Sequence, residues 1–221
     1  MNKQRKSPLA AVLVGGLIGL GGYILAAPAY AHNVVLPFVT HAEFFSTETH
    51  QSPPIDPQVF VAQPSATAGV GPQGIAHAAG VRNARIGDAG SLHIVNAQDK
   101  PLGLSLAAWL GATGKVTLMP MKDGHEKVKV LLSHLKPGGT YSLFENHFDQ
   151  KPIGFTPLDG TGKTNSFVAS RQGKATVTVI APEPLTHDNA VLLVYHSDGK
   201  AHGMSRGNIG VDAHHQLIAR P

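Results

Sequence analysis

The chain has 221 residues, with 18 lysines and arginines against 14 aspartates and glutamates, so its formal net charge at pH 7 is +4. It contains no cysteine, which excludes disulfides, thiolate zinc sites, iron–sulfur clusters, blue-copper sites with a cysteine ligand and cysteine nucleophiles. Histidine is unusually frequent, with 13 residues, all after position 31. At neutral pH most of these imidazoles are uncharged and can act as metal ligands or as hydrogen-bonding groups.

Residues 1–31 are typical of an export signal peptide or an uncleaved membrane anchor. Three basic residues precede an uncharged apolar run at 9–27, whose length of about 19 residues lies between a cleaved signal and a bilayer span. The triplet AYA at 29–31 has the small residues that signal peptidase recognises, so cleavage there leaves His32 first; a competing cut leaves Tyr30 first. In either case we expect a periplasmic or secreted protein, with the membrane as a partner only through a retained anchor.

The apparent basicity of the chain belongs mainly to this leader. It holds three of the basic residues, so 15 remain against 14 acidic residues in the rest of the chain. The sequence pI of 9.4 would suggest nucleic acid or an anionic membrane as a partner, but the excess of positive charge is lost with the leader. We therefore do not expect nucleic acid to be a partner.

Residues 32–90 are expected to form an irregular arm. From Thr47 to Gly90 the chain is rich in Pro, Gly, Ala, Ser and Gln, with no sustained helical or strand period. Before it, VVLPFVTHAEFF mixes β-branched and aromatic residues with one proline, which suits an edge strand or a segment that packs onto another element.

Residues 91–221 are predicted to fold as an antiparallel β-sandwich of the Ig-like or Greek-key type, with a small barrel as the alternative. A single short helix is expected in LSLAAWLGATG, with Ser105 as its N-cap. The strands are short and separated by Gly, Pro and Asp turns at 137–139, 159–160, 172–173 and 197–199. The predicted strands are SLHIVNA, KVTLMP, EKVKVLLSHL, TYSLFENHF, KATVTVIAP, AVLLVYHS and HQLIARP.

The sequence patterns of two of these strands predict which of their faces are buried. In EKVKVLL the apolar residues alternate with lysines, so one side should face solvent. AVLLVY is apolar on both faces, which is typical of a central strand, and it delivers Tyr195 and His196 to one end of the sandwich.

Common catalytic motifs are missing. Gly162-Lys163-Thr164 ends like a phosphate loop, but the required first glycine is a proline and no helix-forming run follows, so we expect a hairpin loop. Ser205 lies in a plain glycine-rich loop without the G-x-S-x-G elbow, and no HExxH motif is present. No acid pair or nucleophile–base pair stands out, which disfavours an enzyme.

The remaining candidates are histidines at strand ends. His147 lies two residues after Glu145, His196 closes the central strand, His202 follows in the next loop, and His214 opens the last strand. Strand ends that meet at one pole of a sandwich can bring imidazoles to the distances that zinc or copper needs. We expect His147, His196 and His214 to form the main cluster; the alternative is that each is an ordinary histidine bonded to backbone.

His32 would be a separate copper ligand if cleavage makes it the first residue. Its amine and ring nitrogen, with a second histidine, could then form a T-shaped histidine brace. This arrangement resembles CopC-type copper carriers and copper-dependent polysaccharide monooxygenases, which use it on β-sandwiches. Copper–zinc superoxide dismutase is a more distant comparison, because its His-x-His strand and its cysteine pair are missing here.

The segments YSLFENHF, PLDGTGKTNSF, VLLVYHSDGKAHG and HHQLIARP resemble a group of exported bacterial proteins of unassigned function. The shared pattern includes the Tyr-His-Ser-Asp-Gly turn at 195–199 and a closing His-x-Gln-Leu strand that favours His214 over His215. The resemblance covers roughly residues 90–221. It implies export and a compact β domain, and no chemistry.

The sequence therefore predicts an exported, histidine-rich, non-catalytic β-sandwich binding protein. Its expected ligand is copper or zinc, held by residues from the set His32, His147, His196, His202 and His214. The alternative is a structural or adhesive extracytoplasmic module that binds a protein partner and no metal. A metal-dependent redox enzyme is a more remote alternative.

Overall fold

The computed structural model describes residues 32–221, which form one compact unit. The predicted signal peptide or anchor, with its cleavage site at 29–31, lies outside the described residues. Among the residues that the structure describes, no helix has the length and apolar character needed to cross a membrane.

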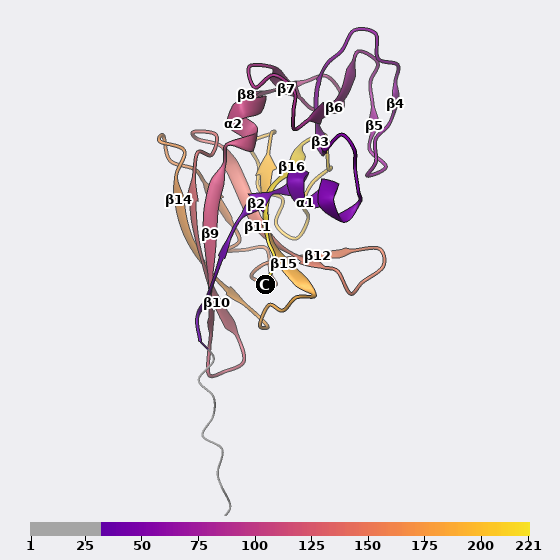
Figure 1. The fold of residues 1–221 in the computed structure, drawn as a ribbon. Coiled ribbons are helices and arrows are strands. Elements are labelled where there is room, and N and C mark those ends of the chain that lie inside the picture. The colour runs from indigo at the N-terminus through magenta and orange to yellow at the C-terminus, as the bar shows by residue number, and fades with distance from the viewer. Residues whose placement is uncertain (1–31) are drawn as a thin grey trace, which may run out of the picture. The chain divides into compact units, whose positions relative to one another are not determined.

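Two antiparallel sheets face each other and confirm the predicted all-β, sandwich-like fold (Figure 1). The first, sheet A, has the order β1-β9-β10-β14, and the second, sheet B, has the order β12-β11-β15-β16-β2 with β13 also paired to β11. The strands of sheet A are β1 (Val34–Pro37), β9 (Thr113–Pro120), β10 (Glu126–Ser133) and β14 (Ala175–Ala181). Those of sheet B are β2 (Val39–Thr40), β11 (Thr140–His147), β12 (Gly154–Pro157), β13 (Ser166–Val168), β15 (Asn189–His196) and β16 (Ala213–Ala219).

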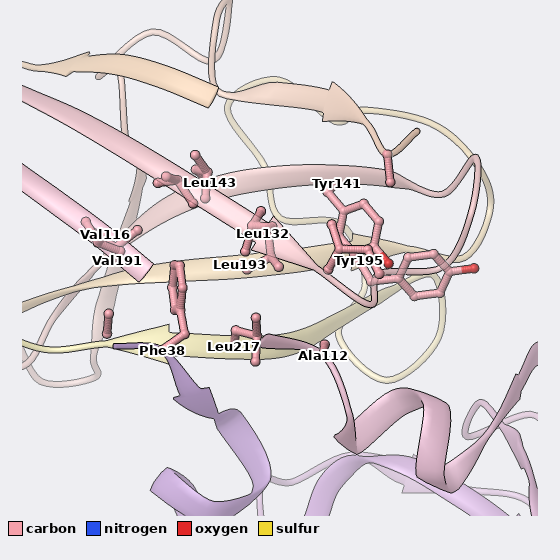
Figure 2. Packing of buried hydrophobic residues seen from close by; sticks show 14 of the residues in the cluster. Phe38, Ala112, Val116, Leu132, Tyr141, Leu143, Val191, Leu193, Tyr195 and Leu217 are labelled. Carbon is pink, nitrogen blue, oxygen red and sulfur yellow. The ribbon is translucent and has the colours of Figure 1, made fainter. Parts of the chain in front are cut away.

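The main core fills the space between these two sheets. Figure 2 shows Val116 and Leu132 of sheet A pointing toward Leu143, Val191 and Leu193 of sheet B. Each fully buried aliphatic side chain of this kind contributes about 2 kcal/mol to folding, so this layer is the main source of stability. The alternation predicted for EKVKVLL is confirmed, because its apolar residues are buried and its lysines are exposed.

The outer face of sheet B is apolar as well, as the sequence AVLLVY predicted. Phe144, Leu192 and Ile218 lie on this face, and Phe44 and Phe155 pack over them. The strand β15 is therefore central and covered on both sides, with β11 and β16 as its neighbours. The layer that covers this outer face comes from α1, from β12 and from the segment 197–212, which connects β15 to β16.

The prediction of an irregular arm over residues 32–90 is wrong. Part of it, with the first strands after residue 90, forms a third antiparallel sheet, sheet C, in the order β6-β3-β7-β8, and a two-stranded hairpin beside it (Figure 1). Since β3 of the supposed arm pairs with β7 of the supposed domain, no domain boundary lies at residue 90. The strands are β3 (Ile55–Ala62), β4 (Gly69–Val70), β5 (Ala76–His77), β6 (Val81–Arg85), β7 (His93–Val95) and β8 (Pro101–Ser105).

The helices differ from expectation in one respect. The helix α2 (Leu106–Leu110) is present with Ser105 as its N-cap, as predicted. A second helix, α1 (His41–Glu48), occupies a segment that was expected to be extended. Thr40 caps it by accepting the backbone N–H of Glu43 at 3.2 Å, so the T-x-x-E spacing at 40–43 was a capping-box signal that the sequence analysis overlooked.

Candidate metal site

The C-terminal end of β15 and the turn after it hold the candidate site. His196 is the last residue of the strand and pairs with Thr140 on β11 and Ala213 on β16, which fixes its backbone in the middle of sheet B. The chain then turns through Asp198 and Gly199, where a φ of +74° suits glycine. The turn is tied back to the sheet because the Thr140 hydroxyl donates to the Gly199 carbonyl at 3.1 Å.

Three possible ligands converge at this turn. One nitrogen of His196, one nitrogen of His202 and one carboxylate oxygen of Asp198 all lie within 4.8 Å of one another. The His202 Nε2 is 3.2 Å from Asp198 Oδ2, and the rings of His196 and His202 are 5.1 Å apart. Because zinc and copper take ligands at about 2 Å, atoms at these separations need only small side-chain rotations to surround one ion.

A chain of hydrogen bonds orients the ring of His196. Asn165 donates its amide to the Leu143 carbonyl at 3.0 Å, which leaves its Oδ1 to accept from Ser166 at 3.3 Å. Ser166 can then accept from Ser142 at 2.8 Å, and Ser142 can accept from His196 Nε2 at 2.8 Å. This direction places the proton of His196 on Nε2 and leaves a lone pair on Nδ1.

The Nδ1 of His196 is buried and has no hydrogen-bond partner among the described residues. Burial, followed by the charge of the neighbouring His202, lowers the pKa of His196 to about 4, although Asp198 and Asp212 act in the opposite direction. The ring is therefore neutral at pH 7. A metal-binding histidine is neutral, has one free lone pair and usually donates its other ring N–H to a carboxylate, a backbone carbonyl or water. In His196 the Ser142 hydroxyl takes the place of that acceptor.

Comparison with protein-family models, with curated proteins and with solved structures finds no match to this chain. The case for a metal site therefore depends on the geometry of these side chains. The resemblances to exported bacterial proteins and to CopC-type carriers stay predictions that no relative tests.

The structure brings together only part of the predicted histidine cluster. His196 and His202 meet, whereas His214 lies on the opposite face of sheet B and packs against Trp109 and Tyr195. Both ring nitrogens of His214 are engaged, Nδ1 with the Gln58 carbonyl at 3.1 Å and Nε2 with the Ser197 hydroxyl at 3.3 Å. This is the ordinary hydrogen-bonded state that was the alternative for each histidine.

The prediction that His147 belongs to the cluster is wrong. It pairs with Asn189 at one end of β15, whereas His196 pairs with Thr140 at the other. Seven residues of strand separate these pairs, which is about 23 Å. His147 bonds to Thr156 at 2.9 Å and to Asn189 at 3.3 Å, and lies 3.7 Å from Glu145.

His32 is exposed and lies far from the cluster. The chain runs from it through β1 into β2, whose Val39 pairs with Ile218 near the end of β16. The residues before β1 therefore lead away from the end of sheet B that holds Ala213 and His196. The structure offers His32 no second ligand from this site, so the predicted brace would need another histidine.

Asp198 is a candidate ligand that the sequence analysis missed. It stands in the Ser-Asp-Gly turn that was treated only as a turn, and it precedes His202 by four residues. The sequence does contain a signal for it, because Asp198 lies between His196 and His202 directly after the end of a strand. Its lysine neighbour, Lys200, donates its backbone N–H to Asp198 Oδ1 at 3.1 Å, which leaves Oδ2 turned toward His202.

Two alternative chemistries fit the structure poorly. Ser142 and His196 form a serine–histidine pair at 2.8 Å, but the serine is 1% exposed and its oxygen also bonds to Ser166, so a substrate has no access. The loop after β12 is not a phosphate loop, because Asp159 accepts the backbone N–H groups that a phosphate would need, including those of Gly162 and Thr164. The predicted hairpin is wrong, since β12 and β13 on either side of the loop both pair with β11 and not with each other.

Proposed function

We propose that this protein is an exported, non-catalytic binding protein that holds one Cu(II) or Zn(II) ion through His196, Asp198 and His202. The observation that carries the proposal is the buried, unpartnered Nδ1 of His196, in a ring that stands beside a second imidazole and a carboxylate. Leaving a buried lone pair without a partner costs free energy, and coordination to a metal would recover that cost.

The donor set favours first-row transition metals over calcium or magnesium. Two imidazoles and one carboxylate suit zinc and copper, and leave room for water as a further ligand. The side chains of His202 and Asp198 are 25% and 30% exposed, which supports entry of an ion from solvent. Iron(II) uses the same ligand types in some enzymes and is a competitor in the test.

Export is the second part of this proposal. It is supported by the basic start, the apolar run and the AYA triplet of residues 1–31. The lack of cysteine is consistent with a metal site built from imidazole and carboxylate in any compartment. A structural or adhesive module without metal is the competing function, and it predicts that added metal has no effect on stability.

The first test is a native mass spectrum of the protein exported with its own leader, before and after one equivalent of Cu(II) or Zn(II). We expect a chain beginning at His32 that retains one ion. We also expect the melting temperature to rise, because a ligand at 100 times its Kd stabilises the native state by about 2.7 kcal/mol. An unchanged mass and an unchanged melting temperature would favour the structural module.

Variants locate the ion. His202→Ala and Asp198→Asn should each weaken binding by about 100-fold, because each removes one of three protein ligands. His93→Ala is the matched control, since His93 is exposed on β7 and should not alter binding. His32→Ala separates copper held at the chain terminus from copper held at the turn. Binding that survives both ligand variants and is lost with His32→Ala would refute the site proposed here.

A further inference from the structure

A second, independent feature is a cavity of about 470 Å³ over the outer face of sheet B. It lies among α1, β12, the segment 197–212 and the turn between β4 and β5. Its apolar wall is aromatic and aliphatic. The main members of this wall are Phe44, Phe45, Phe148, Ile153, Phe155 and Ile209. The volume falls within the range of about 300–1,000 Å³ that is usual for small-molecule sites.

One cation stands in the wall of this cavity. The guanidinium of Arg206 lies 3.2 Å from the ring centre of Phe155 and donates to His215 Nε2 at 3.0 Å. Within residues 32–221 it has no carboxylate within 4.0 Å, and Glu48, which also lines the cavity, forms no ion pair. Burial of the guanidinium lowers the pKa of Arg206 to about 10. A partly buried, unpaired positive charge is unfavourable unless an anion neutralises it.

Arg206 also determines the protonation of the two histidines beside it. A guanidinium can only donate, so His215 must accept at Nε2 and carry its proton on Nδ1. That proton faces His41 Nε2 at 3.4 Å, so His41 in turn carries its proton on Nδ1. The Nδ1 of His41 is buried, lines the cavity region and has no hydrogen-bond partner in the described chain. The Nδ1–H of His41 is therefore a buried donor without an acceptor.

Asn146 adds another unsatisfied polar group to the same cavity. It lies on the outer face of β11, is 4% exposed, and its side-chain Oδ1 is buried without a partner among the described residues. Unpartnered buried groups are uncommon in native structures, and here two of them line one cavity with an unpaired cation. Arg206 and the Nδ1–H of His41 therefore need a partner that accepts hydrogen bonds and carries negative charge, whereas the Oδ1 of Asn146 is an acceptor that needs a donor. The wall requires that the rest of the ligand be apolar.

We infer that this cavity binds a small organic monocarboxylate with an aromatic or aliphatic body. The carboxylate would meet Arg206 and the Nδ1–H of His41, and the body would lie against Phe44, Phe148 and Phe155. A charged guanidinium that is already stacked on an aromatic ring is preorganised for this, because little side-chain freedom is lost on binding. The site is separate from the metal ligands and does not require the metal proposal to hold.

The test is binding of phenylacetate, indole-3-acetate and octanoate to the wild-type protein, followed by NMR and by thermal shift at neutral pH. We expect at least one of the three to bind and to shift the backbone amides of α1, β12 and the 197–212 segment. Phenylacetamide has the shape without the charge and acetate has the charge without the body, so both should bind at least about tenfold more weakly.

Arg206→Gln should weaken carboxylate binding by about 10- to 100-fold, because it removes the charge and keeps a polar side chain. Arg220→Gln is the matched control, since Arg220 also stacks on a phenylalanine, Phe148, at 4.3 Å but is not in the cavity wall. The inference is refuted if no carboxylate binds, if phenylacetamide binds as well as phenylacetate, or if Arg206→Gln leaves the affinity unchanged. Amide shifts of the wild-type protein that are confined to elements outside the cavity wall would also refute it, even if the variant failed to fold.

Discussion

Asp56 is a single buried carboxylate that connects sheet C to α2. It is 1% exposed, and it accepts the backbone N–H of Gln58 at 2.9 Å and of Val59 at 3.0 Å. Its other oxygen accepts the indole N–H of Trp109 at 2.8 Å, across 53 residues of chain. Burial raises the pKa of Asp56 to about 6 despite these three bonds, so at pH 7 and above a buried charge depends on them.

Trp109→Phe removes the side-chain donor to Asp56 and leaves a charged acceptor short of one bond. We expect the free energy of unfolding to fall by about 3 kcal/mol at pH 8, from the lost bond and the smaller ring together. Urea denaturation measures this loss. At pH 5 the native carboxyl is mostly protonated, so the loss should be smaller there; an equal loss at both pH values would mean that only ring packing matters.

The histidines show the same dependence on individual neighbours. His196 and His214 lie on adjacent strands, but one keeps a free ring nitrogen and the other uses both. No property of the residue type distinguishes them. The sequence could identify both as candidates, but which nitrogen stays free depends on Ser142, Gln58 and Ser197, which come from three other places in the chain.

At the scale of elements, the segment 197–212 is important because it carries Asp198 and His202 to one site and Arg206 to the other. It is held against the loop between β12 and β13 at Gly162, where a φ of +69° and the close approach of the Gly203 backbone both require glycine. The position of this segment therefore depends on contact between two loops that are about 40 residues apart in the chain.

Gly162→Ala should displace the segment and weaken the metal site. An added Cβ would meet the Gly203 carbonyl group, so we expect a loss of about 3 kcal/mol in stability together with weaker metal binding. Gly138→Ala is the control, because Gly138 has a φ of +68° with open space around it and should cost only about 1 kcal/mol. Thermal melting and metal titration of both variants measure the difference. Equal losses and unchanged metal affinity would show that the contact does not position the segment.

Helix α1 illustrates the limits of local patterns. Its capping signal at 40–43 is readable, but its eight residues have little helical periodicity, and the helix gains its stability by packing Phe44 over sheet B. Sheet C is a similar case, since β3 contains a proline and β6 contains two arginines. Their pairing buries Phe60 and Val81, and the local composition of the two segments does not predict this burial.

At the scale of the whole molecule, buried neutral histidines should make the protein sensitive to acid. Burial lowers the pKa of His41 to about 3 and of His214 to about 4, and it lowers the pKa of His215 well below its usual value of 6.5. The unfolded chain therefore binds protons at these residues between about pH 6.5 and 4, whereas the native state does not. Their contribution to stability is complete above pH 6.5 and is lost as the pH falls.

We expect the melting temperature to fall steeply between pH 7 and pH 5, since each such histidine costs about 2 kcal/mol over that range. Asp56, Glu126 and Glu145 act in the opposite sense, because burial raises the pKa of each carboxyl and this favours the native state as the pH falls. They oppose four histidines, since burial lowers the pKa of His196 to about 4 as well. Differential scanning calorimetry across this range measures the slope, and His93→Ala, at an exposed position, should leave it unchanged. A melting temperature that stays constant down to pH 5 would contradict this account.

The sequence by itself determined the fold class, the central strand at 189–196, the capped helix at 106–110 and the turns at glycine, because these depend on local periodicity and backbone preference. It also indicated His196 and His202 as candidates. Only the tertiary structure decided that Asp198 joins them, that His147 and His214 do not, and that Arg206 faces a cavity. These outcomes depend on strand register and on contacts between distant segments, and such contacts leave no period or spacing in the chain.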